Sequence, residues 1–294
     1  MFLCRMKTIA DALMIFDEAL KSIHDLDEIN SIKYLVLSDI CNLSKAQIRA
    51  FYDKELSNEQ WHKLVDIVAE LKTGKPVQYI LGHTEFYGLS FYVNPSVLIP
   101  RPETEELVEW ILESQKSKVK SQNDLQILDV GTGSGCIPIS LKKNLPDSNV
   151  SGFDISTEAL KTARKNAELN NVNVDFIEAD ILNWSHISNL TSQISIIVSN
   201  PPYVTVHEKL QMHSNVLDYE PHIALFVPDA DPLLFYNAIA DFALQNLVDG
   251  GLLFFEINEN LGKQTVDLLN HKAFKNIELR QDMRGKDRMI KAER

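Results

Sequence analysis

The chain has 294 residues, of which 45% are hydrophobic and 24% charged, and this balance is typical of a globular protein rather than a disordered, fibrous or membrane one. Its 41 acidic and 29 basic residues give a net charge of −12, so without a long Lys/Arg stripe it is not expected to hold a nucleic-acid duplex by itself. No apolar run approaches the roughly 20 residues that span a bilayer, and Arg5 and Lys7 interrupt the first hydrophobic stretch. We therefore expect a cytoplasmic protein with no membrane partner.

The cysteine and histidine patterns favour neither a disulfide framework nor a metal site. The three cysteines are far apart and form no CxxC pair, and none of the eight histidines belongs to an HExxH motif. We therefore expect no bound metal.

Residues 1–74 show helical periodicity and few strand signals. The clearest helix begins with the capping-box pattern Ser57 to Gln60, and its apolar face continues towards a stop at Gly74. Shorter amphipathic segments complete a small helical bundle, at 6–23, 31–41 and 44–52. Such a bundle could be a folding module or an arm that docks a partner, and its sequence favours neither strongly.

A hairpin-bearing linker is expected over residues 75–102, where four prolines and two glycines interrupt alternating aromatic residues. An acidic run of Glu103, Glu105 and Glu106 then begins a helix that extends to about residue 115, because carboxylates favour the positive end of a helix dipole.

The remaining domain, assigned to residues 103–294, alternates strands and helices. Strands are predicted at 125–130, 149–154, 173–180, 194–199, 251–257, 274–280 and 288–293. Helices are predicted between most of them, at 135–144, 156–170, 232–247 and 260–270. This alternation predicts an α/β fold with a mainly parallel sheet and helices on both faces. Only a short polar stretch joins the last two strands, which predicts a terminal antiparallel hairpin.

A glycine-rich loop follows the first predicted strand, at the carboxyl end where open α/β sheets bind ligands. Glycine lets the backbone turn sharply and approach a ligand closely. Cys136 occupies the position where a dinucleotide-binding GxGxxG motif has its third glycine. The loop instead resembles the nucleoside-binding loop of class I S-adenosylmethionine (SAM) methyltransferases, which have a Rossmann-like fold. Its residues are Asp129, Gly131, Thr132, Gly133, Ser134 and Gly135.

Four residues near the ends of the first three strands complete the predicted SAM site. Asp129 could face the positively charged amino group of SAM, and Asp154, at the end of the second strand, could accept bonds from both ribose hydroxyls. After the third strand, Asp180 could accept from the adenine amino group, and Trp184 could offer an aromatic face. Two simpler interpretations stay open: an ordinary Rossmann-like turn, and a Trp184 side chain that only packs.

The fourth strand runs directly into Asn200-Pro201-Pro202-Tyr203. A residue before proline is kept extended, and proline has no N–H, so this loop presents acceptors. If the Asn200 side-chain oxygen and the Pro201 carbonyl accept both hydrogens of a substrate amide, the nitrogen lone pair can face the SAM methyl. Asn200 is therefore assigned to both the cofactor and the substrate site, and Tyr203 could pack over the planar amide. The alternative is a Pro-Pro turn that merely ends a buried strand.

Motifs along essentially the whole chain resemble the release-factor glutamine methyltransferase family, also called HemK or PrmC. They are KPVQYILG (75–82), FYGLSFYV (86–93), VLIPRPETEELV (97–108), ILDVGTGSGCI (127–137), FDIS (153–156), NPPYV (200–204) and EPHIALF (220–226). The resemblance implies transfer of a methyl group from SAM to N5 of the glutamine in the Gly-Gly-Gln loop of class I peptide chain release factors.

Site residues carry over from this resemblance by motif. Gly131 to Gly135, Asp154 and Trp184 would hold SAM, and the substrate glutamine would lie against Asn200, Pro201, Pro202 and Tyr203. The resemblance also suggests that Phe86 helps to wall the glutamine pocket. Arg101 and Glu103 could shape the site or form a structural ion pair. We expect a monomer whose partner is a release factor.

Two other functions stay open. An adenine or cytosine DNA methyltransferase would share the glycine loop and the Asn-Pro-Pro-Tyr motif, but it would need a basic recognition surface that the sequence does not show. A SAM-binding adaptor without catalytic activity would have no need for an intact Asn200 to Tyr203 motif.

Overall fold

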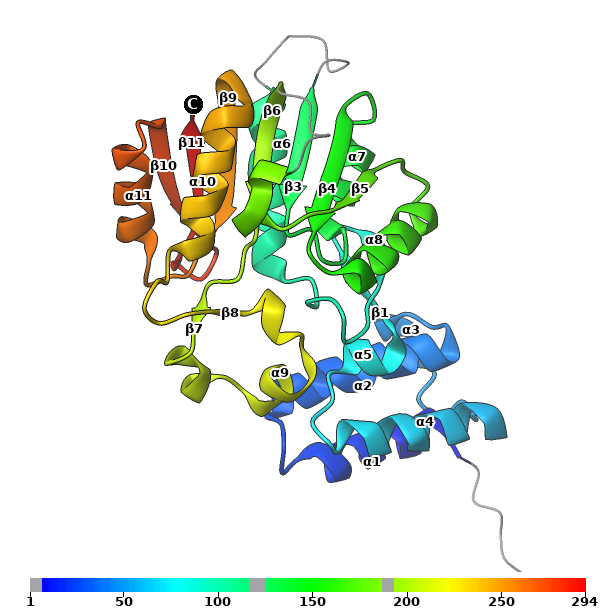
Figure 1. The fold of residues 1–294 in the computed structure, drawn as a ribbon. Helices are drawn as coiled ribbons and strands as arrows, with labels where there is room; N and C mark the ends of the chain where they lie inside the picture. The colour runs from blue at the N-terminus through cyan, green and yellow to red at the C-terminus, as the bar shows by residue number, and fades with distance from the viewer. Residues whose placement is uncertain (1–6, 117–124, 187–192) are drawn as a thin grey trace, which may run out of the picture. The chain divides into compact units, whose positions relative to one another are not determined.

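The computed structural model describes residues 7–116, 125–186 and 193–294, and these form two compact units (Figure 1). The first contains the chain up to Gly82 together with His213–Tyr219, and the second contains His83–Met212 and Glu220–Arg294. The division at Gly82 falls within the region where the sequence predicts a linker. None of the helices in the described ranges is both long enough and apolar enough to cross a membrane.

The first unit is a set of helices, and those that precede Gly82 share one apolar core. Its helices are α1 (Ile9–Leu20), α2 (Leu26–Cys41), α3 (Lys45–Ala50), α4 (Asn58–Leu71), α5 (Val77–Leu81) and α9 (Ser214–Tyr219). The capping box predicted at Ser57 and Gln60 is formed, because each side chain bonds the backbone N–H of the other residue. The Tyr219 hydroxyl connects α9 to this unit, since it lies 3.1 Å from the carbonyl oxygen of Thr73 and 2.9 Å from its hydroxyl.

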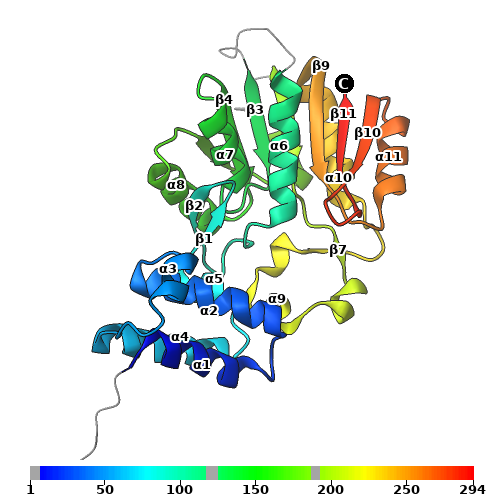
Figure 2. The same ribbon diagram turned by 180° about the vertical axis from the view of Figure 1, so that it is seen from behind.

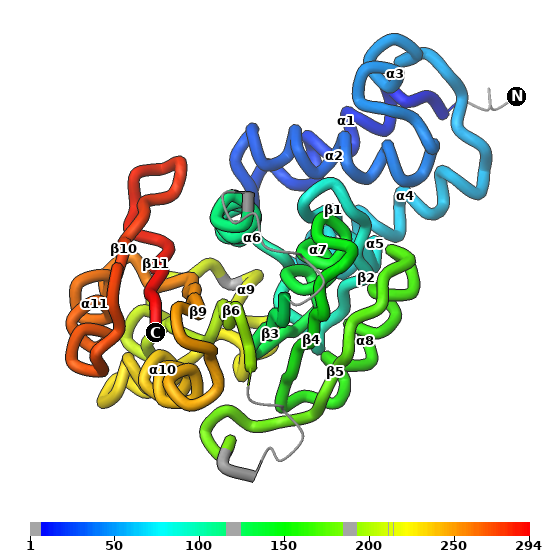
Figure 3. Tube along the Cα trace, turned by 90° about the horizontal axis from the view of Figure 1, so that it is seen from above, coloured from blue at the N-terminus to red at the C-terminus, as the bar shows by residue number. Residues whose placement is uncertain are grey.

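The second unit contains a seven-stranded sheet in the order β10-β11-β9-β6-β3-β4-β5 (Figures 2 and 3). Its strands are β3 (Gln126–Val130), β4 (Asn149–Asp154), β5 (Asp175–Glu178), β6 (Ile194–Ser199), β9 (Leu247–Glu256), β10 (Lys275–Gln281) and β11 (Asp287–Glu293). All neighbours are parallel except β11, which is antiparallel to both β9 and β10. The predicted mainly parallel sheet with a terminal antiparallel hairpin is confirmed. The strand order reverses at β3, which lies between β4 and β6.

Helices cover both faces of this sheet, as predicted. Figure 1 shows α10 (Leu234–Asn246) in front of the sheet, and Figure 2 shows α6 (Pro102–Lys116) on the opposite face. The other large helices are α7 (Cys136–Asn144), α8 (Thr157–Leu169) and α11 (Gly262–His271). Successive residues of β9 point to opposite faces of the sheet. Phe254 packs in the apolar cluster that contains α6 residues, and Phe255 packs in the cluster that contains α10 residues.

The hairpin of β1 (His83–Phe86) and β2 (Leu89–Tyr92) belongs to the second unit. Its Phe86 and Phe91 rings pack edge to face, with centroids 6.0 Å apart, inside the core cluster that also contains α6 residues. Asn166 of α8 fixes the second strand by accepting from Tyr92 N and donating to Tyr92 O. The hairpin is therefore packed against the sheet domain. The short elements that complete this unit are η2 (Ile181–His186), β7 (Val204–Thr205), η3 (Glu208–Gln211), η4 (His222–Ala224) and β8 (Phe226–Val227).

Candidate active site

A cavity of about 300 Å³ lies beyond the carboxyl ends of the parallel strands, where the strand order reverses. This is the position at which open α/β sheets bind ligands, and the volume is that of a small-molecule site. The loops predicted to hold SAM and the substrate amide meet here. They contribute Gly131 to Ser134 after β3, Asp154 to Ser156 from the end of β4, Ala179 to Leu182 after β5, and Ser199 to Pro202 from the end of β6.

The glycine loop is tied to the end of β4. Backbone N–H groups of Gly131 and Thr132 both donate to Phe153 O, at 2.9 and 3.0 Å, and Gly133 N donates to Asp154 Oδ2 at 2.8 Å. Gly131 and Gly133 have φ angles of +75° and +53°, a region that side-chain-bearing residues rarely occupy. The sequence needs glycine here so that the chain can turn back across β4 and leave its backbone facing the cavity.

Asp129 is fully buried at the end of β3, and neither of its carboxylate oxygens has a hydrogen-bond partner among the described residues. Burial raises its pKa to about 7; the neighbouring Thr132 hydroxyl opposes this rise, and the nearby negative charge of Asp154 adds to it. An unpaired buried carboxylate is costly, so a cationic ligand group would relieve it. The ammonium group of SAM fits this requirement, which is the role that the sequence predicts for Asp129.

Asp154 and Asp180 both border the cavity. Asp154 Oδ1 accepts from Ser156 N at 2.9 Å, and its Oδ2 accepts from Gly133 N, so backbone donors fix the carboxylate. Burial raises the Asp154 pKa, although these backbone bonds oppose the rise. Asp180 accepts from Leu182 N at 2.9 Å and from Asn183 Nδ2 at 2.6 Å. Asp154 is thus held by its own loop and by the glycine loop, Asp180 is held by its own loop, and both retain acceptor capacity for a ligand.

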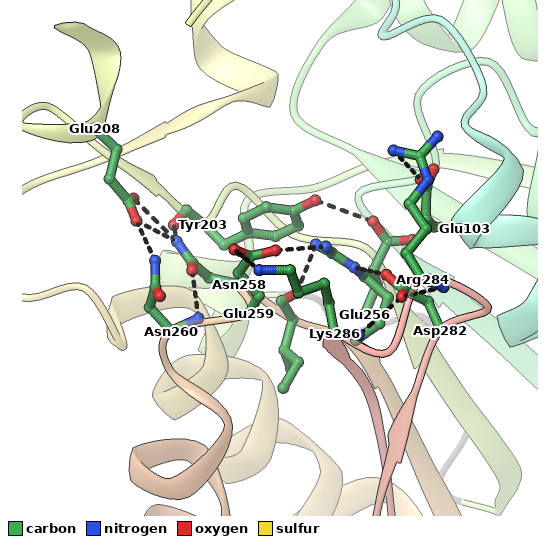
Figure 4. A network of polar contacts seen from close by, with 12 residues as sticks. Glu103, Tyr203, Glu208, Glu256, Asn258, Glu259, Asn260, Asp282, Arg284 and Lys286 are labelled. Carbon is green, nitrogen blue, oxygen red and sulfur yellow. Dashed lines mark hydrogen bonds and ion pairs between the residues drawn. The ribbon is translucent and has the colours of Figure 1, made fainter. Parts of the chain in front are cut away.

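Asn200, Pro201 and Pro202 also border the cavity, next to the glycine loop. Asn200 Nδ2 donates to Thr104 Oγ1 at 3.2 Å, which leaves the side-chain oxygen as an acceptor. Tyr203 does not border the cavity; its hydroxyl donates to Glu256 Oε1 at 3.1 Å, the contact drawn in Figure 4. Acceptors for an amide substrate therefore lie beside a site suited to a cationic cofactor.

Comparison with known proteins identifies the family. The PrmC N-terminal domain matches residues 11–82, and the methyltransferase small domain matches residues 112–219. A release factor glutamine methyltransferase of Flavobacterium psychrophilum is 52% identical, over 94% of this chain and 95% of its own. The chain belongs to the release factor glutamine methyltransferases. Another member, from Bacteroides thetaiotaomicron, is 43% identical over 94% of this chain and 97% of its own.

Solved structures place this family member in the methyltransferase fold. A methyltransferase from Pyrococcus furiosus has a TM-score of 0.50 and 15% identity, covering 81% of this chain and 98% of its own. The catalytic domain of hMettl16 has a TM-score of 0.54 and 13% identity, covering 80% of this chain and 82% of its own. At these identities the likeness concerns the fold alone, and it agrees with the SAM methyltransferase architecture predicted from the sequence.

Two aromatic residues assigned from the family resemblance lie away from the cavity. Trp184 packs edge to face against Phe242 of α10, with ring centroids 5.6 Å apart. Phe86 is 1% exposed and lies in the core cluster beneath the β1–β2 hairpin. The packing alternative accounts for the contacts of Trp184, and Phe86 likewise contributes its ring to the core, because a large aromatic surface is favourably buried there.

The two charged candidates both form ion pairs. Arg101 borders the cavity, and its guanidinium lies 2.5 Å from the buried Glu220 carboxylate, which also accepts from Ile99 N at 3.2 Å. Glu103 pairs with Arg284 at 3.7 Å, at the edge of the network in Figure 4. Arg101 is thus placed where it can shape the cavity, whereas Glu103 has the contacts of a structural pair.

The sequence analysis did not predict that Thr104 and Glu256 contact the candidate site residues. Thr104 Oγ1 donates to Glu256 Oε2 at 2.6 Å while it accepts from Asn200. Burial raises the pKa of Glu256, although its hydrogen bonds to Thr104 and Tyr203 oppose the rise. The signal for Glu256 in the sequence is a carboxylate that directly follows the apolar run GLLFF. A charged residue at the end of a buried strand needs partners, and these partners lie in the Asn200 loop and in α6.

Replacing Gly135 by alanine is expected to destabilise the sheet domain by about 1–3 kcal/mol, because an added Cβ would lie 3.0 to 3.3 Å from Ile139, Ala163 and Phe176. Its φ of +78° adds backbone strain. Urea unfolding would measure the change. Gly285→Ala is the matched control, since Gly285 has a φ of +76° but nothing within 4 Å of the added Cβ. Equal losses in both variants would contradict the packing explanation.

Proposed function

We propose that this chain transfers the methyl group of SAM to the side-chain N5 of the glutamine in the Gly-Gly-Gln loop of class I peptide chain release factors. The observation that carries the proposal is the position of Asn200, whose amide nitrogen is held by Thr104 while its oxygen remains an acceptor at the cavity. Family membership supports the substrate class, because the relatives are named release factor glutamine methyltransferases.

Three carboxylates would hold SAM. Asp129 would pair with its ammonium group, Asp154 would accept from its ribose hydroxyls, and Asp180 would accept from the adenine amino group. When bound, SAM supplies an electrophilic methyl group on a sulfonium. Much of the remaining cavity wall is apolar, including Val97, Leu98 and Ile223. Such a wall excludes water from the site of transfer and strengthens the polar contacts made inside it.

The substrate amide needs orientation because its nitrogen lone pair is delocalised into the carbonyl group. We propose that Asn200 Oδ1 and the Pro201 carbonyl accept its two hydrogens, which turns the lone pair towards the methyl group. The two prolines contribute no N–H donors that could compete for these acceptors. The proton lost from nitrogen can leave after the methyl group has been transferred, so a strong general base is not required.

We propose that the helical unit docks the release factor, since residues 11–82 match the PrmC N-terminal domain. All residues proposed to hold SAM and glutamine belong to one chain, and we propose that the protein acts as a monomer. Because the proposed substrate is part of the translation machinery, we propose that the reaction takes place in the cytoplasm.

The test is incubation of the full-length protein with methyl-labelled SAM and a purified class I release factor, followed by mass spectrometry of the Gly-Gly-Gln peptide. One added methyl group on the glutamine is expected, and a release factor with alanine at that glutamine is the control. Duplex DNA is assayed in parallel. Label on DNA and none on the release factor would instead identify a DNA methyltransferase. SAM binding with transfer to neither would identify an adaptor.

A further inference from the structure

Two buried side chains lie behind Asn200, on the side from which its amide nitrogen is held. Thr104, in the first turn of α6, is 2% exposed, and Glu256, at the end of β9, is 1% exposed. The Thr104 hydroxyl oxygen is 3.2 Å from Asn200 Nδ2 and 2.6 Å from Glu256 Oε2. The second Glu256 oxygen accepts from the Tyr203 hydroxyl at 3.1 Å. A continuous chain of bonds therefore connects Asn200 through Thr104 and Glu256 to Tyr203.

The direction of these bonds distinguishes the two ends of the Asn200 amide. A hydroxyl has one proton, and Thr104 donates it to Glu256 Oε2, so its lone pairs remain available for another donor. Asn200 Nδ2 is that donor. If the amide were flipped, its oxygen would face the Thr104 hydroxyl oxygen, whose proton is already donated to Glu256. The flipped amide would also present N–H groups to the N–H groups of the substrate.

We propose that Thr104 and Glu256 are positioning residues that keep the Asn200 oxygen turned towards the substrate amide. This inference rests on the proposed function. Glu256 also holds the Tyr203 hydroxyl, so one buried carboxylate fixes both ends of the Asn200-Pro201-Pro202-Tyr203 loop. Thr104 borders the cavity and Glu256 does not; we assign each of them an effect that acts through the side chain that it orients.

Thr104→Val removes the hydroxyl while retaining the shape of the side chain. We expect kcat to fall by about 10- to 100-fold, because a misoriented acceptor costs this much, while the Kd of SAM changes less than twofold. Thr104→Ser restores the hydroxyl and should recover most of the rate. Thr265→Val is the matched control: Thr265 is equally buried in α11, where its hydroxyl bonds Leu261 O at 2.9 Å, and this variant should keep the wild-type kcat.

A double-mutant cycle separates an effect on the orientation of Asn200 from a general disruption of the structure by the substitution. If Thr104 acts through Asn200, adding Thr104→Val to Asn200→Ala should cost nothing further, because the group that Thr104 orients is already absent. Single-turnover transfer of labelled methyl can measure the low residual rates. An equal fold-loss in both backgrounds, or a wild-type kcat in Thr104→Val alone, would overturn the inference.

Glu256→Gln provides a second cycle if Thr104→Val does not fold. A glutamine has one acceptor oxygen, so it can serve only one of the two hydroxyl donors and should lower kcat, again without further loss in the Asn200→Ala background. Undiminished kcat in this variant would equally contradict the inference. An inactive wild-type protein would refute the proposed function instead, so the two failures are distinguishable.

Discussion

Asn200→Ala is expected to lower the rate of methyl transfer by about 10²- to 10³-fold, the usual cost of removing one oriented polar group from an active site. The variant loses the oxygen proposed to accept a hydrogen of the substrate amide, and the lone pair is no longer directed at the methyl group. SAM affinity should change little, because the carboxylates proposed to hold SAM lie on other loops. Single-turnover transfer to a release factor measures the rate, and calorimetry measures SAM affinity.

Asn144→Ala is the control for this prediction. Asn144 ends α7, where its side chain donates to Ser140 O at 2.9 Å, and it does not border the cavity. It should keep the wild-type rate. Full activity in Asn200→Ala would exclude the proposed orientation mechanism. A loss of SAM binding as large as the loss of rate would make Asn200 a cofactor ligand rather than a residue that orients the substrate.

Asp129→Asn is expected to have opposite effects on stability and on SAM binding. Removing an unpaired buried charge should stabilise the ligand-free protein, because a neutral amide costs less to bury than an ion. A rise in pKa from 3.8 to about 7 corresponds to a cost of up to about 4 kcal/mol when the group is ionised. Loss of the proposed pair with the SAM ammonium should weaken binding by about 2–5 kcal/mol. Urea unfolding and calorimetry measure the two effects.

The pH dependence follows from the direction of this shift. The folded pKa of Asp129 lies above the unfolded one, so its contribution to stability is fully present below about pH 4 and is lost as the pH rises through about 7. The stability gained by Asp129→Asn should therefore grow over this range. Wild-type SAM affinity should rise over the same range as the carboxylate ionises, and the variant should lack this part of the rise. A variant less stable than wild type at pH 8 would contradict these expectations.

The parts of the fold with unbroken local patterns could be predicted from the sequence. The strands at 149–154 and 194–199 have the predicted bounds, because each is a short apolar segment between polar turns. The strand predicted at 251–257 begins earlier, at Leu247. Gly250 and Gly251 interrupt its apolar pattern, and its pairing with β6 shifts register in this region. Helix α2 begins before its predicted start, because Asp25 caps it by accepting from Asp27 N and Glu28 N.

Part of the candidate site could likewise be predicted from the sequence, and part could not. Gly131, Asp154 and Asn200 follow strands directly, so the sheet alone brings them to one edge. The bond between Thr104 and Glu256 joins residues 152 positions apart, and no local pattern specifies such a pairing. The direction in which Trp184 points was equally hidden, because it depends on Phe242 in a helix that follows much later in the chain.

The position of β11 has a consequence for how the enzyme is made. This strand is the last of the described strands in sequence but lies inside the sheet, between β9 and β10, and among the described strands β10 pairs only with β11 (Figure 3). During synthesis, β9 can pair with β6 on one edge, but its other edge and β10 have no partner in the sheet until residues 287–293 are available. The end of β9 that carries Glu256 lies opposite Met289 of β11, so this part of the sheet is completed only when the last strand is inserted.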